Sequence, residues 1–296
     1  MQHSPKGTTP AQTGDLLRQW IDRHQRLFVL TGAGCSTDSG IPDYRDRGGA
    51  WKRRPPVTIQ AFTGDAATYR RYWARSCVGW PRIATAQPNT VHHVLAEWES
   101  GGRLSALLTQ NVDGLHQRAG CQAVIDLHGR IDAVICLDCG ASLPRSDLQL
   151  VMETANPDWR MPDSRIAPDG DADIDPARIS GFLPPRCDDC RGMLKPDVVF
   201  FGENVPRARV DAASRALCSS DALLVIGSSL MVYSGFRFAR MASESGMPIA
   251  ILNRGRTRAD TIADLKLDAD AGATLLAASQ QSQAPRSDQR LENSPR

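Results

Sequence analysis

LFVLTGAGCSTDSGIPDYR, at residues 27–45, is the stretch that decides the fold. The apolar residues 27–30 predict a buried strand, and they run directly into a loop that contains Gly32 and Gly34. Backbone N–H groups in such a turn can approach a pyrophosphate closely, because glycine places no side chain in the way. The stretch therefore predicts a dinucleotide-binding turn of a parallel sheet. A tight strand–helix turn without a ligand is the plainer alternative.

The glycine spacing differs from that of the usual dehydrogenase fingerprint. That fingerprint needs a third glycine three residues after the second, where this chain has Thr37. The acidic residue that would hold the ribose about 20 residues further on is not evident either. The loop favours a dinucleotide ligand but not a hydride-transfer enzyme.

Short apolar runs bounded by turn signals recur along the chain and predict further strands. They lie at 104–108, 124–127, 198–201, 222–226 and 249–252. Helical spacing of apolar residues appears within residues 12–24, and again up to residue 98 after a capping residue at Asn89 or Thr90. This alternation predicts an α/β fold, with a Rossmann-like parallel sheet and helices on both faces.

Residues 131–196 break the alternation and carry two Cys-x-x-Cys pairs. The first pair is Cys136 with Cys139, and the second is Cys187 with Cys190. Four thiolates from two such turns complete the tetrahedral ligand set of a closed zinc site, so we expect one structural Zn2+. A redox dithiol is the alternative, but a redox centre needs only one pair.

The domain organisation follows from these patterns. The Asp- and Pro-rich stretch 156–175 is interpreted as a solvated loop, and the last residues as a disordered tail because they lack periodicity. The predicted units are a Rossmann-like domain of residues 12–130 and 197–278 with a small helical subdomain at about 44–88, a zinc-binding module at 131–196, and a tail at 279–296.

Composition limits the classes of function. The chain has 296 residues, of which 41% are apolar and 23% charged, as in ordinary globular proteins. No apolar run has the length of a membrane helix, and residues 1–14 lack the apolar core of a secretion signal. A net charge of +2 argues against general affinity for nucleic acid or anionic lipid. We expect a cytoplasmic protein with no membrane and no specific nucleic-acid partner; a mitochondrial matrix location is the alternative.

Polar residues follow the predicted strands directly. In an open parallel sheet the carboxyl ends of the strands face the ligand crevice, so these groups can meet at one ligand. A histidine among them is a natural general base for a sugar hydroxyl, although any one of them alone could be a turn or a cap. The residues concerned are Gln110, Asn111, Asp113, His128, Gly227, Ser228, Ser229 and Asn253.

These residues, in this order, resemble the sirtuins, which are NAD-dependent protein-lysine deacylases. The resemblance runs from about residue 16 to residue 278. Segments at 71–75, 136–140, 167–170 and 232–235 are similar to the class II branch, which includes a mitochondrial sirtuin with weak deacetylase activity. The matching motifs are the glycine loop 32–45, TQNVD at 109–113, LHG at 127–129, both cysteine pairs, KPDVVFFG at 195–202, GSSL at 227–230 and Asn253.

The resemblance implies that NAD binds as a co-substrate and that zinc is structural. The acyl oxygen of an acyl-lysine protein or peptide would attack C1′ of the nicotinamide ribose and expel nicotinamide. His128 and Asn111 would be catalytic, with His128 deprotonating a ribose hydroxyl, and water would release free lysine and O-acyl-ADP-ribose. The residues implied at NAD are Gly32, Ala33, Gly34, Ser36, Asp43, Tyr44, Arg45, Gln110, Asn111, Asp113, Gly227, Ser228, Ser229, Asn253 and Ala271.

The resemblance also implies where the substrate lies. The peptide would add as a strand between residues 199–202, which are Val199, Phe200, Phe201 and Gly202, and the segment after Leu230. Tyr72 and Arg75 match a pair that binds acidic acyl groups in a related branch, and a structural ion pair of Arg75 is the alternative. Two other functions stay open, protein mono-ADP-ribosyl transfer and a non-catalytic NAD sensor or scaffold. A base at His128 argues against the sensor.

Overall fold

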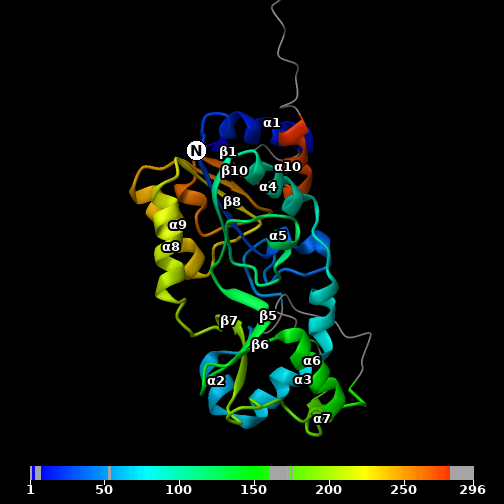
Figure 1. Cartoon of the computed structure of the whole chain (residues 1–296). Coiled ribbons are helices and arrows are strands. Elements are labelled where there is room, and N and C mark those ends of the chain that lie inside the picture. The colour runs from blue at the N-terminus through cyan, green and yellow to red at the C-terminus, as the bar shows by residue number, and fades with distance from the viewer. Residues whose placement is uncertain are drawn as a thin grey trace, which may run out of the picture.

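The computed structural model describes residues 2–3, 8–52, 55–159, 172, 174 and 176–280. Seven parallel strands form the larger sheet, in the order β1-β10-β9-β8-β2-β3-β4 (Figure 1). Among the described residues, no helix combines the length and the apolar character that crossing a membrane requires. The strands are β1 (Gln2–His3), β2 (Leu27–Thr31), β3 (Leu104–Thr109), β4 (Val124–Asp126), β8 (Ala222–Ile226), β9 (Ile249–Leu252) and β10 (Leu265–Leu267).

Helices cover both faces of this sheet, because its central strands are apolar on both sides. Val29 of β2 belongs to the core under α1 (Pro10–Ile21), α4 (Thr90–Ser100) and α10 (Ala271–Gln280). The next residue back, Phe28, belongs to the opposite core under α8 (Arg207–Cys218) and α9 (Tyr233–Glu244). The predicted Rossmann-like sheet with helices on both faces is confirmed.

Local sequence explains how the covering helices begin and pack. The side chain of Asn89 accepts a hydrogen bond of 2.9 Å from the backbone N–H of Val91, so Asn89 rather than Thr90 caps α4. Gly14 lets α1 and α10 approach, since a Cβ there would lie 2.5 Å from the Cβ of Ala277. These contacts hold α1, α4 and α10 as one layer.

A second, antiparallel sheet has the order β6-β5-β7 and lies below the first in Figure 1. Helices α2 and α3, from the stretch expected as a small helical subdomain, share one apolar core with this sheet. Trp73, Tyr69 and Leu194 are buried in that core. The elements of this part are α2 (Ile59–Gly64), α3 (Ala66–Thr85), β5 (Gly129–Cys136), β6 (Ser142–Pro144), α6 (Arg145–Ala155), α7 (Pro176–Ile179) and β7 (Leu194–Val198).

The strand predicted at 198–201 is wrong in place and partner. The strand β7 ends at Val198 and pairs antiparallel with β5, outside the parallel sheet. Beyond it, Val199 donates its N–H to the carbonyl of His128 at 2.8 Å, and Phe201 forms an isolated bridge with Thr58. Val198 and Phe200 of this run are buried in the core of the second sheet, whereas Val199 and Phe201 are partly exposed, so the apolar run does not mark a strand of the parallel sheet. The stretch 156–175 and the tail 279–296 fall largely outside the described residues.

Candidate active site

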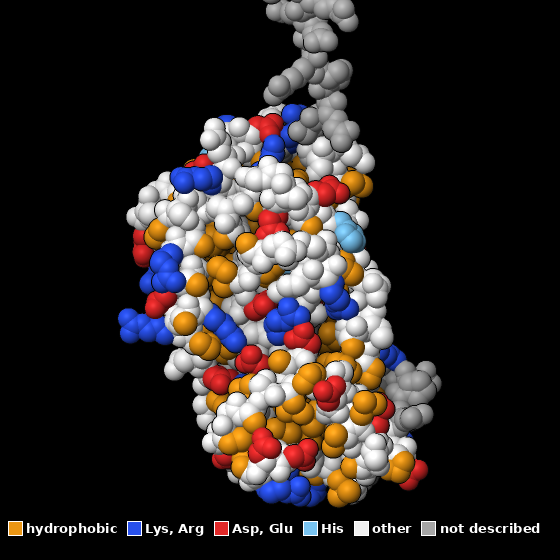
Figure 2. Space-filling view, in the orientation of Figure 1, with side chains coloured by type: hydrophobic (Ala, Val, Ile, Leu, Met, Phe, Trp, Pro, Cys, Tyr) orange, Lys and Arg blue, Asp and Glu red, His pale blue; other side chains and the backbone are white. Residues whose placement is uncertain are grey.

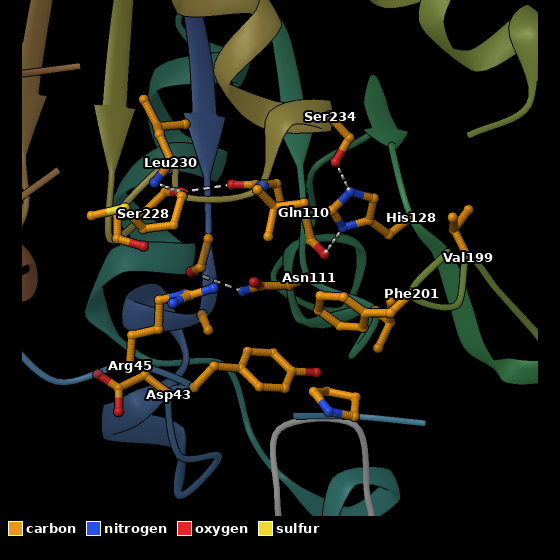
Figure 3. Close-up of a pocket in the computed structure, with 18 of the residues that line it drawn as sticks. Asp43, Arg45, Gln110, Asn111, His128, Val199, Phe201, Ser228, Leu230 and Ser234 are labelled. Atoms are coloured by element: carbon orange, nitrogen blue, oxygen red, sulfur yellow. Dashed lines mark hydrogen bonds between the residues drawn. The ribbon is translucent and has the colours of Figure 1, made fainter. Parts of the chain in front are cut away.

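A cavity of about 400 Å³ opens at the carboxyl ends of β2, β3, β8 and β9, where the loop after β7 forms one wall. Figure 3 shows His128 between Gln110 and Ser234, with Val199 and Phe201 nearby. Of the site residues predicted from the sequence, the cavity is lined by Gly32, Ala33, Gly34, Ser36, Asp43, Tyr44, Arg45, Tyr72, Gln110, Asn111, Asp113, His128, Val199, Phe200, Phe201, Gly202, Gly227, Ser228, Ser229 and Asn253.

The glycine loop packs backbone to backbone against the turn after β8. The N–H of Gly34 donates to the carbonyl of Gly227 at 2.8 Å. A Cβ on Gly34 would lie 2.9 Å from both Cα and O of Gly227, so no larger residue fits without moving the backbone. Gly227 has a positive φ of 61°, and a Cβ there would lie 2.5 Å from the N of Cys35. The two turns therefore pack directly against each other and form one continuous surface at the cavity wall.

A hydrogen-bond network joins that surface to the loop after β3. The Asn111 amide donates to the carbonyl of Gly32 at 3.1 Å and to Ser36 Oγ at 3.0 Å. Ser36 in turn donates to Asp113 Oδ2 at 2.7 Å, and the N–H of Leu115 donates to the other carboxylate oxygen at 2.9 Å. Burial raises the pKa of Asp113, and these two hydrogen bonds oppose the rise. The network fixes polar groups of Asn111 and Ser36 at the cavity wall.

His128 is held in a defined tautomer. Its Nδ1 lies 3.0 Å from the backbone carbonyl of Gln110, which only accepts, so Nδ1 carries the proton. Its Nε2 lies 2.7 Å from the Ser234 hydroxyl, and in the neutral ring this nitrogen is the acceptor. Burial lowers the pKa of His128, and the cation of Arg209 lowers it further. A neutral imidazole with its basic nitrogen at a cavity can remove a proton from a hydroxyl.

Aromatic and charged side chains form the rim near the glycine loop. The guanidinium of Arg45 lies 3.9 Å from the Trp51 ring and donates to the carbonyl of Gly49 at 2.7 Å. The Tyr44 ring meets Trp51 edge-on, with centroids 6.0 Å apart. Asp43 pairs with Lys52. The rim residues are thus held by contacts within the protein.

Two predicted site residues do not line the cavity. Arg75 donates through Nε to the carbonyl of Ala172 at 2.6 Å, whereas Tyr72, one turn earlier on α3, does reach the cavity. Ala271 begins α10 and is not among the lining residues.

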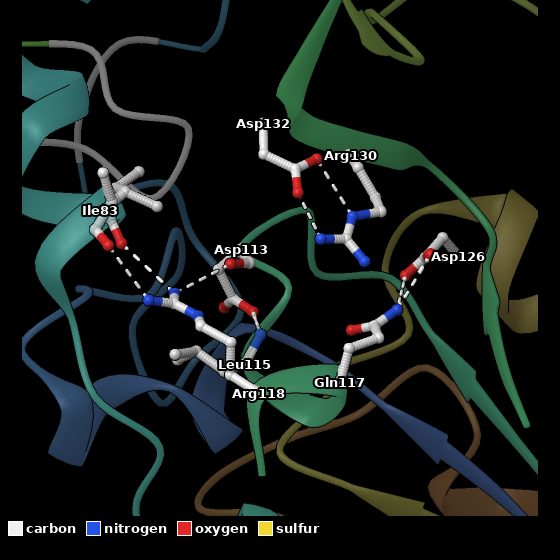
Figure 4. Close-up of polar contacts among 9 residues, drawn as sticks. Ile83, Asp113, Leu115, Gln117, Arg118, Asp126, Arg130 and Asp132 are labelled. Carbon is white, nitrogen blue, oxygen red and sulfur yellow. Dashed lines mark hydrogen bonds and ion pairs between the residues drawn. The ribbon is translucent and has the colours of Figure 1, made fainter. Parts of the chain in front are cut away.

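Arg118, on α5 (Leu115–Arg118), ties the loop after β3 to the end of α3 (Figure 4). It donates to the carbonyl of Ala86 at 2.8 Å and, through the other terminal nitrogen, to that of Asp113 at 3.1 Å. On the neighbouring strand, the Asp126 carboxylate accepts from the Gln117 amide at 3.0 Å. The backbone of the Asp113 loop is therefore anchored to both parts of the fold.

The four cysteines form a cluster at the ends of β5 and β7, apart from the cavity lining. Their sulfur atoms all lie within 4.8 Å of one another. The sulfurs of Cys136 and Cys190 are 3.5 Å apart, and those of Cys139 and Cys187 are 3.7 Å apart. A tetrahedral zinc with Zn–S bonds of about 2.3 Å separates its sulfurs by roughly 3.8 Å. The donor set and its spacing therefore fit zinc.

Sequence reasoning assigned no role to three groups that shape this site. Ser234 contacts His128 from a position 106 residues away, and Arg118 reaches back to α3. Lys195 holds the loop after β7 through the carboxylate of Glu203 at 3.2 Å. Ser234 and Lys195 lie inside segments that resemble the family, which hinted at a role; for Arg118, no local signal in the sequence marks the contact.

Comparison with known proteins gives concordant matches. A sequence model described as Sir2 family matches residues 32–234. The chain is 59% identical over 266 residues to the "NAD-dependent protein deacetylase" of Xanthomonas axonopodis pv. citri (strain 306), covering 90% of this chain and 91% of that protein. It is 47% identical over 262 residues to the "NAD-dependent protein lipoamidase sirtuin-4, mitochondrial" of Bos taurus, covering 88% and 83% respectively.

Solved structures agree with these matches. The structure described as "Sir2-p53 peptide-NAD+" superposes with a TM-score of 0.71 at 30% identity, covering 90% of this chain and 97% of that one. Another, described as "Structure of Sir2Tm bound to a propionylated peptide", has a TM-score of 0.71 at 28% identity, covering 90% and 98%.

Proposed function

The chain belongs to the Sir2 family, and from this premise we propose that it is an NAD-dependent protein-lysine deacylase that releases nicotinamide, free lysine and O-acyl-ADP-ribose. The observation that carries the proposal is His128, whose neutral imidazole has its basic Nε2 at the cavity beside the glycine loop. A protein that only binds NAD needs no such base.

The NAD co-substrate supplies the ribose that accepts the acyl group. We assign its phosphates to the surface formed by Gly32, Gly34 and Gly227, which lines the cavity at the carboxyl ends of β2 and β8. Asn111 and Asp113 would hold the nicotinamide ribose and carboxamide, supported by their network with Ser36. We assign no contact with NAD to Ala271 and no contact with the acyl group to Arg75, because neither residue lines the cavity.

His128 would act as the general base. With Nδ1–H donating to the Gln110 carbonyl, the lone pair of Nε2 is available to a ribose hydroxyl that displaces the Ser234 hydroxyl. Burial lowers the pKa of His128, which keeps the imidazole unprotonated and able to accept at neutral pH.

The acyl-lysine peptide would lie as an added strand between residues 199–202 and the segment after Leu230, since both line the cavity. The cysteine cluster, apart from the cavity, would hold zinc in a structural role. We assign the enzyme to a reducing compartment, the cytoplasm, because none of the eight cysteines forms a disulfide.

The test is incubation of the protein with NAD and a panel of acyl-lysine peptides, with detection of O-acyl-ADP-ribose by mass spectrometry. We expect product from at least one acyl group, and none from His128→Ala, which should still bind NAD. His93→Ala, at an exposed histidine of α4, is the matched control and should keep activity. ADP-ribosylated protein in place of O-acyl-ADP-ribose would show transferase chemistry and overturn the proposal.

A further inference from the structure

The carboxylates at the cavity all have hydrogen-bond or ion-pair partners within the protein. Glu203 pairs with Lys195 at 3.2 Å and accepts from the N–H of Phe200 at 2.9 Å. Asp43 pairs with Lys52. Asp46 accepts hydrogen bonds from the backbone N–H groups of Gly48 and Ala50. Asp113 accepts from Ser36 and from the N–H of Leu115.

By contrast, Arg237 is a cation at the cavity that has no acidic partner among the described residues. It lies on α9 and lines the cavity, and its buried Nε has no hydrogen-bond partner in the structure. Its guanidinium lies 5.4 Å from the centroid of the Tyr233 ring, which orients it. Within the described part of the chain, no carboxylate lies within ion-pairing distance of it. A half-buried guanidinium of this kind is best satisfied by a carboxylate, which it can bind through two parallel hydrogen bonds.

The position of Arg237 indicates which part of the substrate it would contact. Arg237 is one turn from Ser234, which contacts His128, and α9 follows the segment proposed to pair with the peptide. Tyr72, at the proposed acyl end, belongs to the core of the second sheet, whereas α9 packs on the first. Arg237 therefore lies on the wall beside the peptide rather than among the residues proposed for the acyl group.

A second cation, Arg258, adds positive charge next to α9, outside the cavity lining. Arg258 lies 4.4 Å from the Phe236 ring and donates to the carbonyl of Met231 at 3.4 Å, within the segment that precedes α9. Arg side chains are also visible over α8 and α9, on the left of the space-filling view (Figure 2), where acidic side chains lie among them and Arg207 pairs with Asp211. Positive charge along a cleft attracts acidic ligands and favours their binding.

We propose that Arg237 reads an acidic side chain of the substrate peptide, one or two residues from the acyl-lysine, and so gives the enzyme a preference for acidic sequences. The proposal rests on the deacylase function and adds its substrate class. Backbone pairing of an added strand carries little sequence information, so a side-chain contact of this kind would supply it.

The test uses acetyl-lysine peptides with Glu or its neutral isostere Gln at each of the two positions on either side of the lysine, and a glutaryl-lysine peptide with neutral flanks. Peptide Kd by fluorescence anisotropy and kcat/KM are both measured. We expect Glu at one position or more to improve Kd and kcat/KM about tenfold over Gln, which corresponds to about 1.4 kcal/mol. The preference should shrink with added salt.

Variants of α9 assign the preference to one residue. Arg237→Gln should remove it and Arg237→Lys should keep part of it, both with little change for the neutral peptide. Arg240→Gln is the matched control, because Arg240 lies on the same helix, 5.6 Å from the same Tyr233 ring, but is exposed and pairs with Glu244. It should keep the full preference.

Equal binding of Glu and Gln peptides, or a preference that survives Arg237→Gln, would overturn the proposal. So would an Arg237-dependent preference for the glutaryl group alone, which would assign the contact to the acyl chain. If no peptide is turned over, the deacylase function fails, and the anisotropy data still decide whether Arg237 binds acidic peptides.

Discussion

Lys195→Met tests whether the ion pair of Lys195 with Glu203 holds the loop after β7, which contains residues 199–202. Lys195 is 3% exposed, and its ammonium donates to the carbonyl of Val198 and to Glu203 at 3.2 Å. The same Glu203 oxygen accepts the N–H of Phe200 at 2.9 Å. One ion pair thus fixes the turn that leads into residues 199–202. Methionine keeps the buried stem and removes only the charge and the two hydrogen bonds.

The magnitude follows from the burial of the two partners. Removing one member of a fully buried ion pair costs about 3–5 kcal/mol, because the other charge is left without compensation. The Glu203 side chain is 31% exposed, so water can solvate it in part and the cost falls below that range. We expect a loss of about 2–3 kcal/mol in the free energy of unfolding. At roughly 2–4 °C per kcal/mol, Tm should fall by roughly 4–12 °C.

The assay combines thermal unfolding with steady-state kinetics. We expect the peptide KM to rise about tenfold, equivalent to about 1.4 kcal/mol, because the peptide would pair with the loosened segment. The NAD KM should stay within about twofold, since the glycine surface lies on other loops. Glu203→Gln keeps an acceptor for both donors but leaves the Lys195 ammonium, which is 3% exposed, without a counter-charge, so it should lose at least as much, about 3 kcal/mol. An unchanged Tm and peptide KM in Lys195→Met would refute the reasoning.

Three further predictions concern the remaining parts of the site. Gly34→Ala should raise the NAD KM at least about tenfold, since the new Cβ would lie 2.9 Å from the Gly227 backbone; kinetics at saturating peptide measure this. Elemental analysis should find one zinc ion in the parent protein and less in Cys139→Ser, which should also unfold at a lower temperature; full zinc content in the variant would contradict the four-sulfur site. Burial lowers the pKa of His92 to about 2 and that of His116 to about 4, so both stay neutral in the folded protein while the unfolded chain binds protons below about pH 6.5. Stability should therefore fall as pH drops, by about 2 kcal/mol per histidine between pH 7 and 5, and denaturant titrations should show about half of that loss in His116→Gln.

The strands of the parallel sheet could be read from the sequence because their signal is local. The runs predicted at 104–108, 222–226 and 249–252 match β3, β8 and β9 to within one residue. Buried parallel strands are apolar on both faces, so each strand can be recognised from its own apolar residues, without knowledge of the strands beside it. The same local rule failed at 198–201, where burial in the core of the second sheet produces the same pattern without a strand of the parallel sheet.

The side-chain partners could not be predicted in this way, because they depend on residues that are far apart in the chain. Ser234 reaches His128 across 106 residues, and Arg75 bonds to the backbone of Ala172 across 97. The spacing of Tyr72 and Arg75 on one helix suggested a shared ligand, yet only Tyr72 lines the cavity. Spacing says which face of a helix a residue occupies; it does not say which acceptor that face meets.

Arg237 and Arg240 lie on the same helix but differ in whether the sequence provides a nearby acidic partner. Both lie on α9 beside the Tyr233 ring, and the spacing of Arg240 and Glu244 predicts the ion pair that forms at 3.3 Å. The residue four positions after Arg237 is Met241, so the sequence alone indicates that Arg237 lacks this local partner. That its guanidinium lies at the cavity follows only from the fold. A cation without a local partner, placed by the fold at a cleft, is therefore the feature that we expect to determine which substrates bind.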